Sequence, residues 1–230
     1  MPQRRQGSAS SSELSRRKQA LRTSMRKRLK GLDPKARRQA GRQVAEHLRP
    51  RLEALCDERR EGKTPPPVVA FFASLPWEID TTPLDHLLRR LGVGRALPAY
   101  RTGELTFHRI EAGVAVADLL PDRMGIPTPP ADAPVVPVTS CALVVAPGLA
   151  FDDRGFRLGQ GGGYYDRALA AMRTSGGGPM VVGVCLDLQR VPEVPRGPHD
   201  QRVDAVCSPA EGVREFGGVT RGGEGKEKSR

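Results

Sequence analysis

Continuous apolar runs of strand length constrain the fold of this chain more than any other feature. Val68–Ser74 is such a run, and similar runs cover Ala142–Pro147 and Met180–Leu186. Strands without alternating polar residues are buried on both faces, as in parallel sheets that helices cover. We expect two further strands at Arg95–Ala99 and Leu105–Ile110. The sequence therefore predicts an α/β fold with a single domain, in which helices cover both faces of a central, mostly parallel sheet.

Two basic helices are predicted at the N-terminus, before the first strand. Between Leu14 and Leu32, apolar residues recur at helical spacing, and lysine and arginine fill the other faces. Asp33 and Pro34 then have the pattern of an N-cap followed by the first turn of a second helix. The inner face of that second helix would consist of Val44, Leu48, Leu52 and Leu55.

Two more helices are predicted among the strands. Thr82-Pro83-Leu84-Asp85 resembles a capped helix start, and Gly92 would end that helix. A further helix would run from about Tyr165 to Met172. Helices that alternate with buried strands are what an α/β sheet requires.

The positive charge of the chain is concentrated in its first 60 residues. The net charge is +11, but residues 1–60 carry 18 lysines and arginines against 6 acids, which leaves 19 basic and 20 acidic residues in the remainder. This surplus keeps open the alternative of a nucleic-acid-binding protein that uses the basic helices. Single-strand binding requires aromatic residues that alternate with positive charges. In this chain aromatic residues are scarce and do not alternate with the positive charges. We therefore expect no specific nucleic-acid partner.

The two ends of the chain lack the composition of a folded domain. Residues 1–12 are rich in arginine and serine and contain no acid, which predicts a disordered basic tail, with an organelle transit peptide as the minority alternative. Residues 211–230 are rich in glycine and charge and predict a second disordered tail. The folded domain would thus span residues 13–210.

Cysteine usage and hydropathy indicate a cytoplasmic protein. Cys56, Cys141, Cys185 and Cys207 are far apart and have no histidines at ligand spacing, which predicts reduced, buried thiols rather than a zinc site or disulfides. No apolar run approaches the roughly 20 residues that span a bilayer. We expect no association with a membrane.

The glycine-rich segment is the strongest functional signal in the chain. The predicted strand Ala142–Pro147 leads into Gly155–Arg167, which then enters a helix, and ligands of α/β sheets bind at such carboxyl ends of strands. Glycines let backbone N–H groups approach a phosphate, and the following helix adds a partly positive N-terminus. The pattern matches neither the P-loop nor the dinucleotide fingerprint. It indicates an anion cradle, with a flexible linker as the alternative. Arg154, just before this segment, and Arg157 and Arg167 within it would supply positive charge.

Five segments in the same order resemble one known family. They are Lys18–Arg22, Phe72–Thr81, Gly125–Pro129, Leu149–Arg167 and His199–Asp204. Together they are similar to the signature of the 5-formyltetrahydrofolate cyclo-ligases, also called methenyltetrahydrofolate synthetases, over about residues 14–209. The resemblance implies an enzyme that uses ATP as co-substrate and Mg²⁺ to convert 5-formyltetrahydrofolate into 5,10-methenyltetrahydrofolate, with release of ADP and phosphate.

The resemblance also implies roles for the residues at matching positions. Arg157 and Tyr165 would be catalytic, and Asp166 and Asp200 would bind Mg²⁺. The folate would be bound by Ala73, Glu78, Gly161, Gly162, Gly163 and Tyr164. ATP would be bound by Lys18, Arg22, Arg157, Leu158, Gly159, Gln160, Gly161, Gly162, Gly163, Tyr164 and Tyr165.

Without the resemblance, the same residues have plainer interpretations. Lys18 and Arg22 would be two charges on one face of a solvated basic helix. Asp166 would be an acid that the dipole of a helix favours in its first turn, and Asp200 would be a turn aspartate.

Two loop positions depart from some members of the family. Gln160 stands where some members have arginine, and Gly162 stands where some have lysine. We expect Arg157, Arg167 or Lys18 to supply the missing charge. The partners would be small molecules, and the protein would be a monomer. A different ATP-dependent transferase that uses the same loop is the second alternative.

Overall fold

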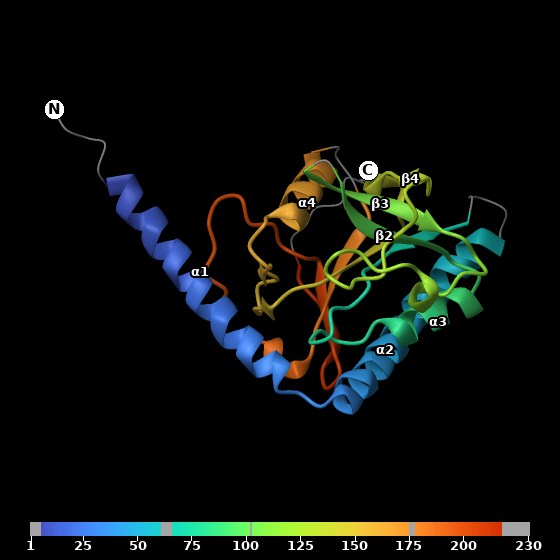
Figure 1. Ribbon diagram of the computed structural model, residues 1–230, viewed down its shortest axis with the longest axis horizontal. Helices are drawn as coiled ribbons and strands as arrows, with labels where there is room; N and C mark the ends of the chain where they lie inside the picture. The colour runs from blue at the N-terminus through green and yellow to red at the C-terminus, as the bar shows by residue number, and fades with distance from the viewer. Residues whose placement is uncertain (1–5, 61–65, 102, 175–177, 218–230) are drawn as a thin grey trace, which may run out of the picture.

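The protein is built around one large sheet, seen in a computed structural model that describes residues 6–60, 66–101, 103–174 and 178–217 (Figure 1). Within these residues the sheet has eight strands in the order β10-β9-β8-β5-β1-β2-β3-β4. Their bounds are β1 Val68–Ala70, β2 Gly94–Arg101, β3 Glu104–Ile110, β4 Val135–Val136, β5 Leu143–Ala146, β8 Met180–Val184, β9 Ala205–Ser208 and β10 Gly212–Glu215. A separate small hairpin joins β6, Ala150–Phe151, to β7, Arg157–Leu158.

The centre of the sheet is parallel and its edges are antiparallel. β9, β8, β5, β1 and β2 form an uninterrupted parallel block. β10 pairs antiparallel with β9, while β3 pairs antiparallel with both β2 and β4. β1, β5 and β8 are buried at every residue, as their continuous apolar runs predict, and β9, which the sequence did not predict, is buried in the same way.

Helices cover both faces of the sheet. Alternate residues of each strand point to opposite faces, so Leu143 and Val145 join one core cluster while Val144 and Ala146 join the other. α1, α2 and α3 pack on the first cluster, and α4 packs on the second through Leu169. Figure 1 shows α2 and α3 together, away from α4. The helices are α1 Gln6–Lys30, α2 Pro34–Arg60, α3 Thr82–Arg90 and α4 Tyr164–Thr174, with short 3-10 helices at Val116–Asp118, Val138–Ser140 and Asp187–Gln189. The predicted fold class is confirmed.

Both ends of the described chain are more ordered than the sequence predicts. α1 begins at Gln6, inside the tail expected at residues 1–12, because extending an existing helix by a residue is far easier than starting one. β10 lies inside the tail expected at residues 211–230, because its backbone pairs with β9 and Val213 packs against the core. Regular structure therefore extends beyond residue 13 at one end and beyond residue 210 at the other. Residues 1–5 and 218–230 lie outside the described residues.

The start of α3 differs from the predicted capping pattern. Thr82 is the first helical residue, and Thr81 before it makes no side-chain cap. Asp85 instead turns into the core, where it pairs with Arg95 of β2 and accepts a hydrogen bond from the backbone N–H of Val116 at 3.1 Å. Both side chains are 1% exposed. The acid that the pattern assigns to a helix cap therefore joins α3 to the sheet.

Three of the four cysteines are buried free thiols, as predicted. Cys141, Cys185 and Cys207 are buried, and Cys56 is half-buried. Burial raises the pKa of the Cys141 thiol to about 11 and that of Cys207 to about 12, which keeps both protonated at neutral pH. In the part of the chain that the structure describes, no helix has the length and apolar character needed to cross a membrane.

Candidate functional site

The glycine-rich loop connects β7 to α4 and lies beside the end of β5. Gly161 and Gly163 have φ angles of 120° and 64°, in the region that side chains other than glycine rarely adopt. Pro147 and Gly148, directly after β5, line the same cavity as the loop. The predicted strand thus ends at the site, although the small hairpin of β6 and β7 separates it from the loop.

A basic stripe on α1 faces this loop. Lys18, Arg22 and Arg26 recur every four residues, which places them on one helix face. Arg22 donates to the carbonyl oxygen of Gly159 at 3.0 Å. Arg26 donates to the backbone and side-chain oxygens of Gln160 at 2.9 and 3.0 Å. Burial, together with the nearby charge of Arg26, lowers the pKa of the Arg22 guanidinium. The stripe therefore concentrates positive charge against the loop.

Arg157 stands at the centre of the site. Its Nη1 donates to the carbonyl oxygen of Pro147 at 3.2 Å, and its Nη2 donates to Asp166 at 3.1 Å. The side chain is 3% exposed, yet its Nε has no hydrogen-bond partner. Tyr165 stacks beside the guanidinium at 5.4 Å, and its buried hydroxyl also lacks a partner. Burial raises the pKa of the Tyr165 phenol. Two buried donors are thus left for a ligand to satisfy.

Asp166 and Asp200 lie on the same side of the loop. Asp166 accepts a hydrogen bond from the backbone N–H of Gln201 at 3.3 Å, which brings the neighbour of Asp200 against it. Asp200 holds Lys18 at 2.7 and 2.5 Å. Mg²⁺ commonly takes one or two carboxylates and completes its shell with water and phosphates, so these two fit its chemistry. The described residues contain no group of three or more potential metal ligands.

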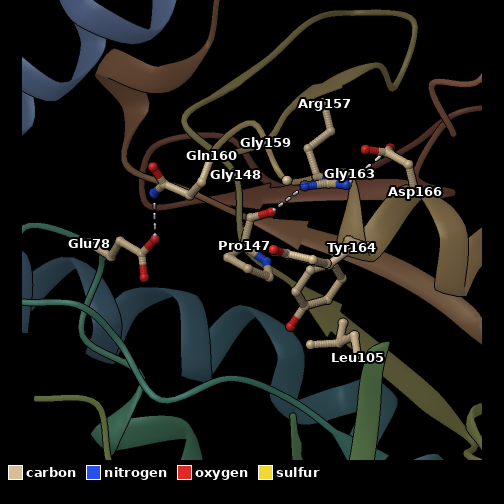
Figure 2. Close-up of a pocket in the computed structure, with 12 residues that line it drawn as sticks. Glu78, Leu105, Pro147, Gly148, Arg157, Gly159, Gln160, Gly163, Tyr164 and Asp166 are labelled. Atoms are coloured by element: carbon tan, nitrogen blue, oxygen red, sulfur yellow. Dashed lines mark hydrogen bonds and ion pairs between the residues drawn. The ribbon is translucent and has the colours of Figure 1, made fainter. Parts of the chain in front are cut away.

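Two adjoining cavities meet at the loop. The smaller, about 150 Å³, lies between Arg157 and Tyr164, and Figure 2 shows Glu78 and Gln160 across it from Asp166. The larger, about 580 Å³, extends over β2 and the segment around Met124. Five residues line both: Glu78, Leu105, Pro147, Gln160 and Tyr165. A ligand in one cavity would therefore contact a ligand in the other.

Glu78 is the buried acid between the cavities. It is 8% exposed, accepts from the backbone N–H of Leu75 at 3.1 Å and receives a longer bond from Gln160 Nε2 at 3.4 Å. Burial raises the pKa of its carboxyl, and these two hydrogen bonds oppose the shift. Ala73 lines the larger cavity at the start of the same segment. A carboxylate here can accept paired N–H donors from a ring.

Comparison with known proteins decides the family. Residues 14–209 match the model of the 5-formyltetrahydrofolate cyclo-ligase family. The chain belongs to this family. It is 31% identical over 195 residues to the 5-formyltetrahydrofolate cyclo-ligase of Escherichia coli K12, covering 81% of this chain and 97% of that protein. It is 27% identical over 179 residues to that of Haemophilus influenzae, covering 77% and 90%.

A solved structure supports the same assignment. The 5,10-methenyltetrahydrofolate synthetase of Aquifex aeolicus superimposes with a TM-score of 0.67 at 25% identity, covering 92% of this chain and 99% of that one. The chain described here is therefore an enzyme of the ligase class, as its resemblance to the cyclo-ligases implies. Family membership supports conversion of 5-formyltetrahydrofolate to 5,10-methenyltetrahydrofolate.

The structure brings most of the expected site residues together. Those with atoms at the loop or the two cavities are Lys18, Arg22, Ala73, Glu78, Arg157, Gly159, Gln160, Gly161, Gly162, Gly163, Tyr164, Tyr165, Asp166 and Asp200. Leu158 differs, because its side chain lies in the core and its backbone pairs with β6. Arg26 is the residue that sequence reasoning missed. The spacing from Lys18 through Arg22 could have indicated it.

Proposed function

We propose that this cyclo-ligase uses ATP and Mg²⁺, with the triphosphate at the glycine loop and 5-formyltetrahydrofolate in the larger cavity. The main support is that Glu78, Gln160 and Tyr165 line both cavities. The terminal phosphate of ATP and the formyl group of the folate would therefore meet where the two cavities join. Effective catalysis of phosphoryl transfer depends on such positioning and on electrostatic stabilisation.

The reaction overcomes the poor reactivity of a formamide. The formyl oxygen attacks the terminal phosphorus of ATP, the bond to the bridging oxygen breaks, and ADP leaves. The carbon, now an iminium bearing a phosphate group, is attacked by N10, which loses its proton. Phosphate then departs with the original formyl oxygen, and the five-membered ring is closed. The protein must therefore align two anionic ligands and spread the charge of a transferring phosphoryl group.

The positive charge needed for this step comes from two directions. Arg22 and Arg26 reach the loop from α1. Arg157 comes from β7, directly before the loop, and its Nε has no hydrogen-bond partner. We assign Arg26 the charge that some relatives supply at position 160, because Arg26 binds both oxygens of Gln160. Backbone N–H groups of the glycines would complete the cradle, since no Cβ atoms screen them.

Asp166 and Asp200 would hold Mg²⁺ beside the phosphates. The ion would supply charge neutralisation for the transferring group when bound. Lys18 donates to both oxygens of Asp200, and Arg157 donates to one oxygen of Asp166. These cations would then turn toward phosphate oxygens, which are chemically similar acceptors.

Glu78 would orient the folate. Its carboxylate lies where the larger cavity meets the loop, and it can accept hydrogen bonds from a pterin ring N–H and the exocyclic amine. Gln160 joins Glu78 to the loop, so it could transmit the position of one ligand to the other.

The decisive experiment is formation of the methenyl chromophore from 5-formyltetrahydrofolate by the purified full chain. We expect absorbance to rise only when ATP and Mg²⁺ are both present and to stop when the metal is chelated. Activity without ATP, or with chelator in excess, would contradict the proposal.

The loop can be tested separately with a matched pair of glycine substitutions. Gly161→Val adds bulk at the cradle, and we expect the KM for ATP to rise. Gly103→Val is the control, because Gly103 also has a positive φ, 88°, but nothing lies within 4 Å of an added Cβ. An unchanged KM in Gly161→Val, or the same rise in both, would contradict the cradle.

A further inference from the structure

A second basic cavity lies between α2 and α3, lined by residues other than those of the two cavities described above. Its volume is about 400 Å³, within the range of small-molecule sites. Arg38 and Arg42 line it from α2, and His86 and Arg90 line it from α3. Each pair is spaced four residues apart, so each helix presents two basic groups on one face. The two helices thus hold four basic side chains around one hollow.

The arginines of this cavity form no close ion pair, unlike several others on the surface. Among the described residues, none of Arg38, Arg42 and Arg90 donates a side-chain hydrogen bond or lies within ion-pair distance of an acid, although Arg90 is near enough to Glu46 to influence its pKa. Elsewhere, the arginines that pair with acids on the surface include Arg49, Arg51, Arg154, Arg190 and Arg214. Three like charges around one hollow repel one another unless an anion joins them.

The two acids of the cavity are already engaged. Glu46 accepts two hydrogen bonds from Arg49 at 2.8 and 2.6 Å, which lower the pKa of its carboxyl. Asp80 accepts from the backbone N–H of Thr82 at 2.9 Å, at the start of α3. The N-terminus of this nine-residue helix adds its own partial positive charge. The charge of Arg90 also contributes to the lowering of the Glu46 pKa, but the three arginines of the cavity outnumber its two acids.

We infer that this cavity is a binding site for a small, multiply charged phosphate compound, separate from the ATP site. Guanidinium groups bind phosphate oxygens through paired N–H donors, and several around one hollow favour more than one phosphate group. A concave site between two helices fits a small ligand, whereas nucleic-acid surfaces need extended charge and stacking side chains. We name this hollow, defined by Arg38, Arg42, His86 and Arg90, the arginine cavity.

The arginine cavity is joined to the folate site by one short segment. Asp80 faces the cavity and Glu78, two residues earlier, faces the folate site. Hydrogen bonds join the two ends of the segment that runs from residue 72 to residue 81. Thr81 Oγ1 donates to the carbonyl oxygen of Phe72 at 2.7 Å, and Ser74 Oγ donates to that of Ile79 at 2.6 Å. The backbone of this segment also packs tightly against α2. A Cβ atom added to Gly41 of α2 would lie only 2.0 Å from the backbone carbonyl oxygen of Asp80. This segment therefore gives a direct physical connection between the arginine cavity and Glu78.

Calorimetric titration of the full chain with tripolyphosphate tests the site. We expect two classes of binding, one at the glycine loop and one in the arginine cavity. Arg42→Gln should weaken one class about tenfold, the effect of removing a charged hydrogen bond. The double variant Arg22→Gln, Arg26→Gln should weaken the other. Lys35→Gln removes a charge from an exposed position of α2 outside the cavity and should change neither class more than about twofold.

The results of this titration test the arginine cavity and the proposed ATP site independently of each other. A single class that Arg42→Gln weakens supports the arginine cavity and counts against phosphate binding at the loop. A single class that only the double variant weakens overturns the inference, as do equal effects of Arg42→Gln and Lys35→Gln. Tighter binding of a short DNA duplex than of tripolyphosphate, lost in Arg42→Gln, would also overturn it.

Coupling to the folate site has its own readout. At saturating ATP, tripolyphosphate should change the KM for 5-formyltetrahydrofolate at least about fivefold in the native chain and leave it unchanged in Arg42→Gln, because about fivefold is the lower end of typical coupling between two sites. This coupling rests on the folate site proposed above. A change of the same size in both proteins overturns the coupling.

Discussion

Two buried arginine–aspartate pairs in this enzyme have the same chemistry and opposite surroundings. Arg95 pairs with Asp85, and its other terminal nitrogen donates to the carbonyl oxygens of Glu111 and Val114 at 2.6 and 2.7 Å. Arg157 pairs with Asp166, but its Nε has no partner and the aspartate is 17% exposed beside a cavity. The first pair is closed within protein. The second is open to a ligand.

This difference teaches how to separate structural from reactive ion pairs. A buried charge is tolerated when nearby groups satisfy all its hydrogen bonds, and such a pair holds elements together. A buried donor without a partner is an unfavourable arrangement that persists where binding or reaction requires it. The two pairs should therefore respond differently to the same aspartate-to-asparagine substitution.

Loss of charge in the closed pair should have the largest effect, and the effect should be on stability. Asp85→Asn leaves the Arg95 charge buried without its partner, and we expect the free energy of unfolding to fall by about 3–5 kcal/mol. Urea denaturation measures this. Asp118→Asn, at an exposed position of the 3-10 helix that Asp85 contacts, should stay within about 0.5 kcal/mol. Equal losses in both variants would remove the distinction between the pairs.

The open pair should respond in turnover instead. Asp166→Asn keeps the shape of the side chain but removes the charge that would hold Mg²⁺, and we expect kcat to fall about 10²–10³-fold, the range seen when one electrostatic group is lost. Steady-state kinetics over a magnesium titration measures it. The free energy of unfolding is measured beside it and should fall by less than in Asp85→Asn, because Asp166 is 17% exposed whereas Asp85 is 1% exposed. Asp153→Asn, at an exposed acid, is the control. Native turnover at every magnesium concentration would refute the role of Asp166.

The sequence predicts what each segment determines by itself. The continuous apolar runs predict β1, β5 and β8, and the spacing of Val44, Leu48 and Leu52 predicts the buried face of α2, where all three are at most 4% exposed. By contrast β10 has no apolar run, since it is Gly-Val-Arg-Glu, and it forms because β9 supplies its hydrogen bonds. Local pattern cannot reveal pairing that a neighbour provides.

The site follows the same rule. The glycine loop is visible in the sequence, and family resemblance supplies Lys18 and Asp200 as separate residues. Their contact joins positions 182 residues apart, so no spacing could predict it. The burial of Asp85 also escaped prediction, because a helix-start acid is normally a surface group and only the fold places Arg95 opposite it.

A third prediction concerns the charge that reaches the open pair's cavity from α1. Arg26→Gln should raise the KM for ATP about ten- to hundredfold with a smaller change in kcat, because a charged hydrogen bond contributes about 1.5–3 kcal/mol. Arg26→Lys should restore part of the affinity, since it keeps the charge but loses the paired donors. Arg17→Gln, exposed on the same helix, is the matched control. A KM for ATP that is native in Arg26→Gln would leave Gln160 without a compensating charge.

The smallest effect should appear in the pH dependence of folate binding. Burial raises the pKa of Glu78, so this carboxyl takes up a proton at a higher pH than an exposed glutamate would. As the pH falls through that raised value, Glu78 loses acceptor capacity toward a pterin, and we expect the KM for 5-formyltetrahydrofolate to rise about threefold, within the range for a neutral hydrogen bond.

The raised pKa of Glu78 affects stability in the opposite direction. Low pH weakens folate binding but favours the folded state, so the two measurements check each other. Because the folded state binds the Glu78 proton more tightly than the unfolded state, the stabilisation from this group is present at low pH and is lost as the pH rises through the raised pKa. Glu78→Gln cannot titrate, so its KM should be flat where that of the native chain rises, and its stability relative to the native chain should increase with pH. Glu104→Gln, exposed on β3, should follow the native chain in both measurements. Parallel profiles for Glu78→Gln and Glu104→Gln would show that the buried acid between the two cavities does not titrate in this range, and that it belongs with the closed pair rather than with the open one.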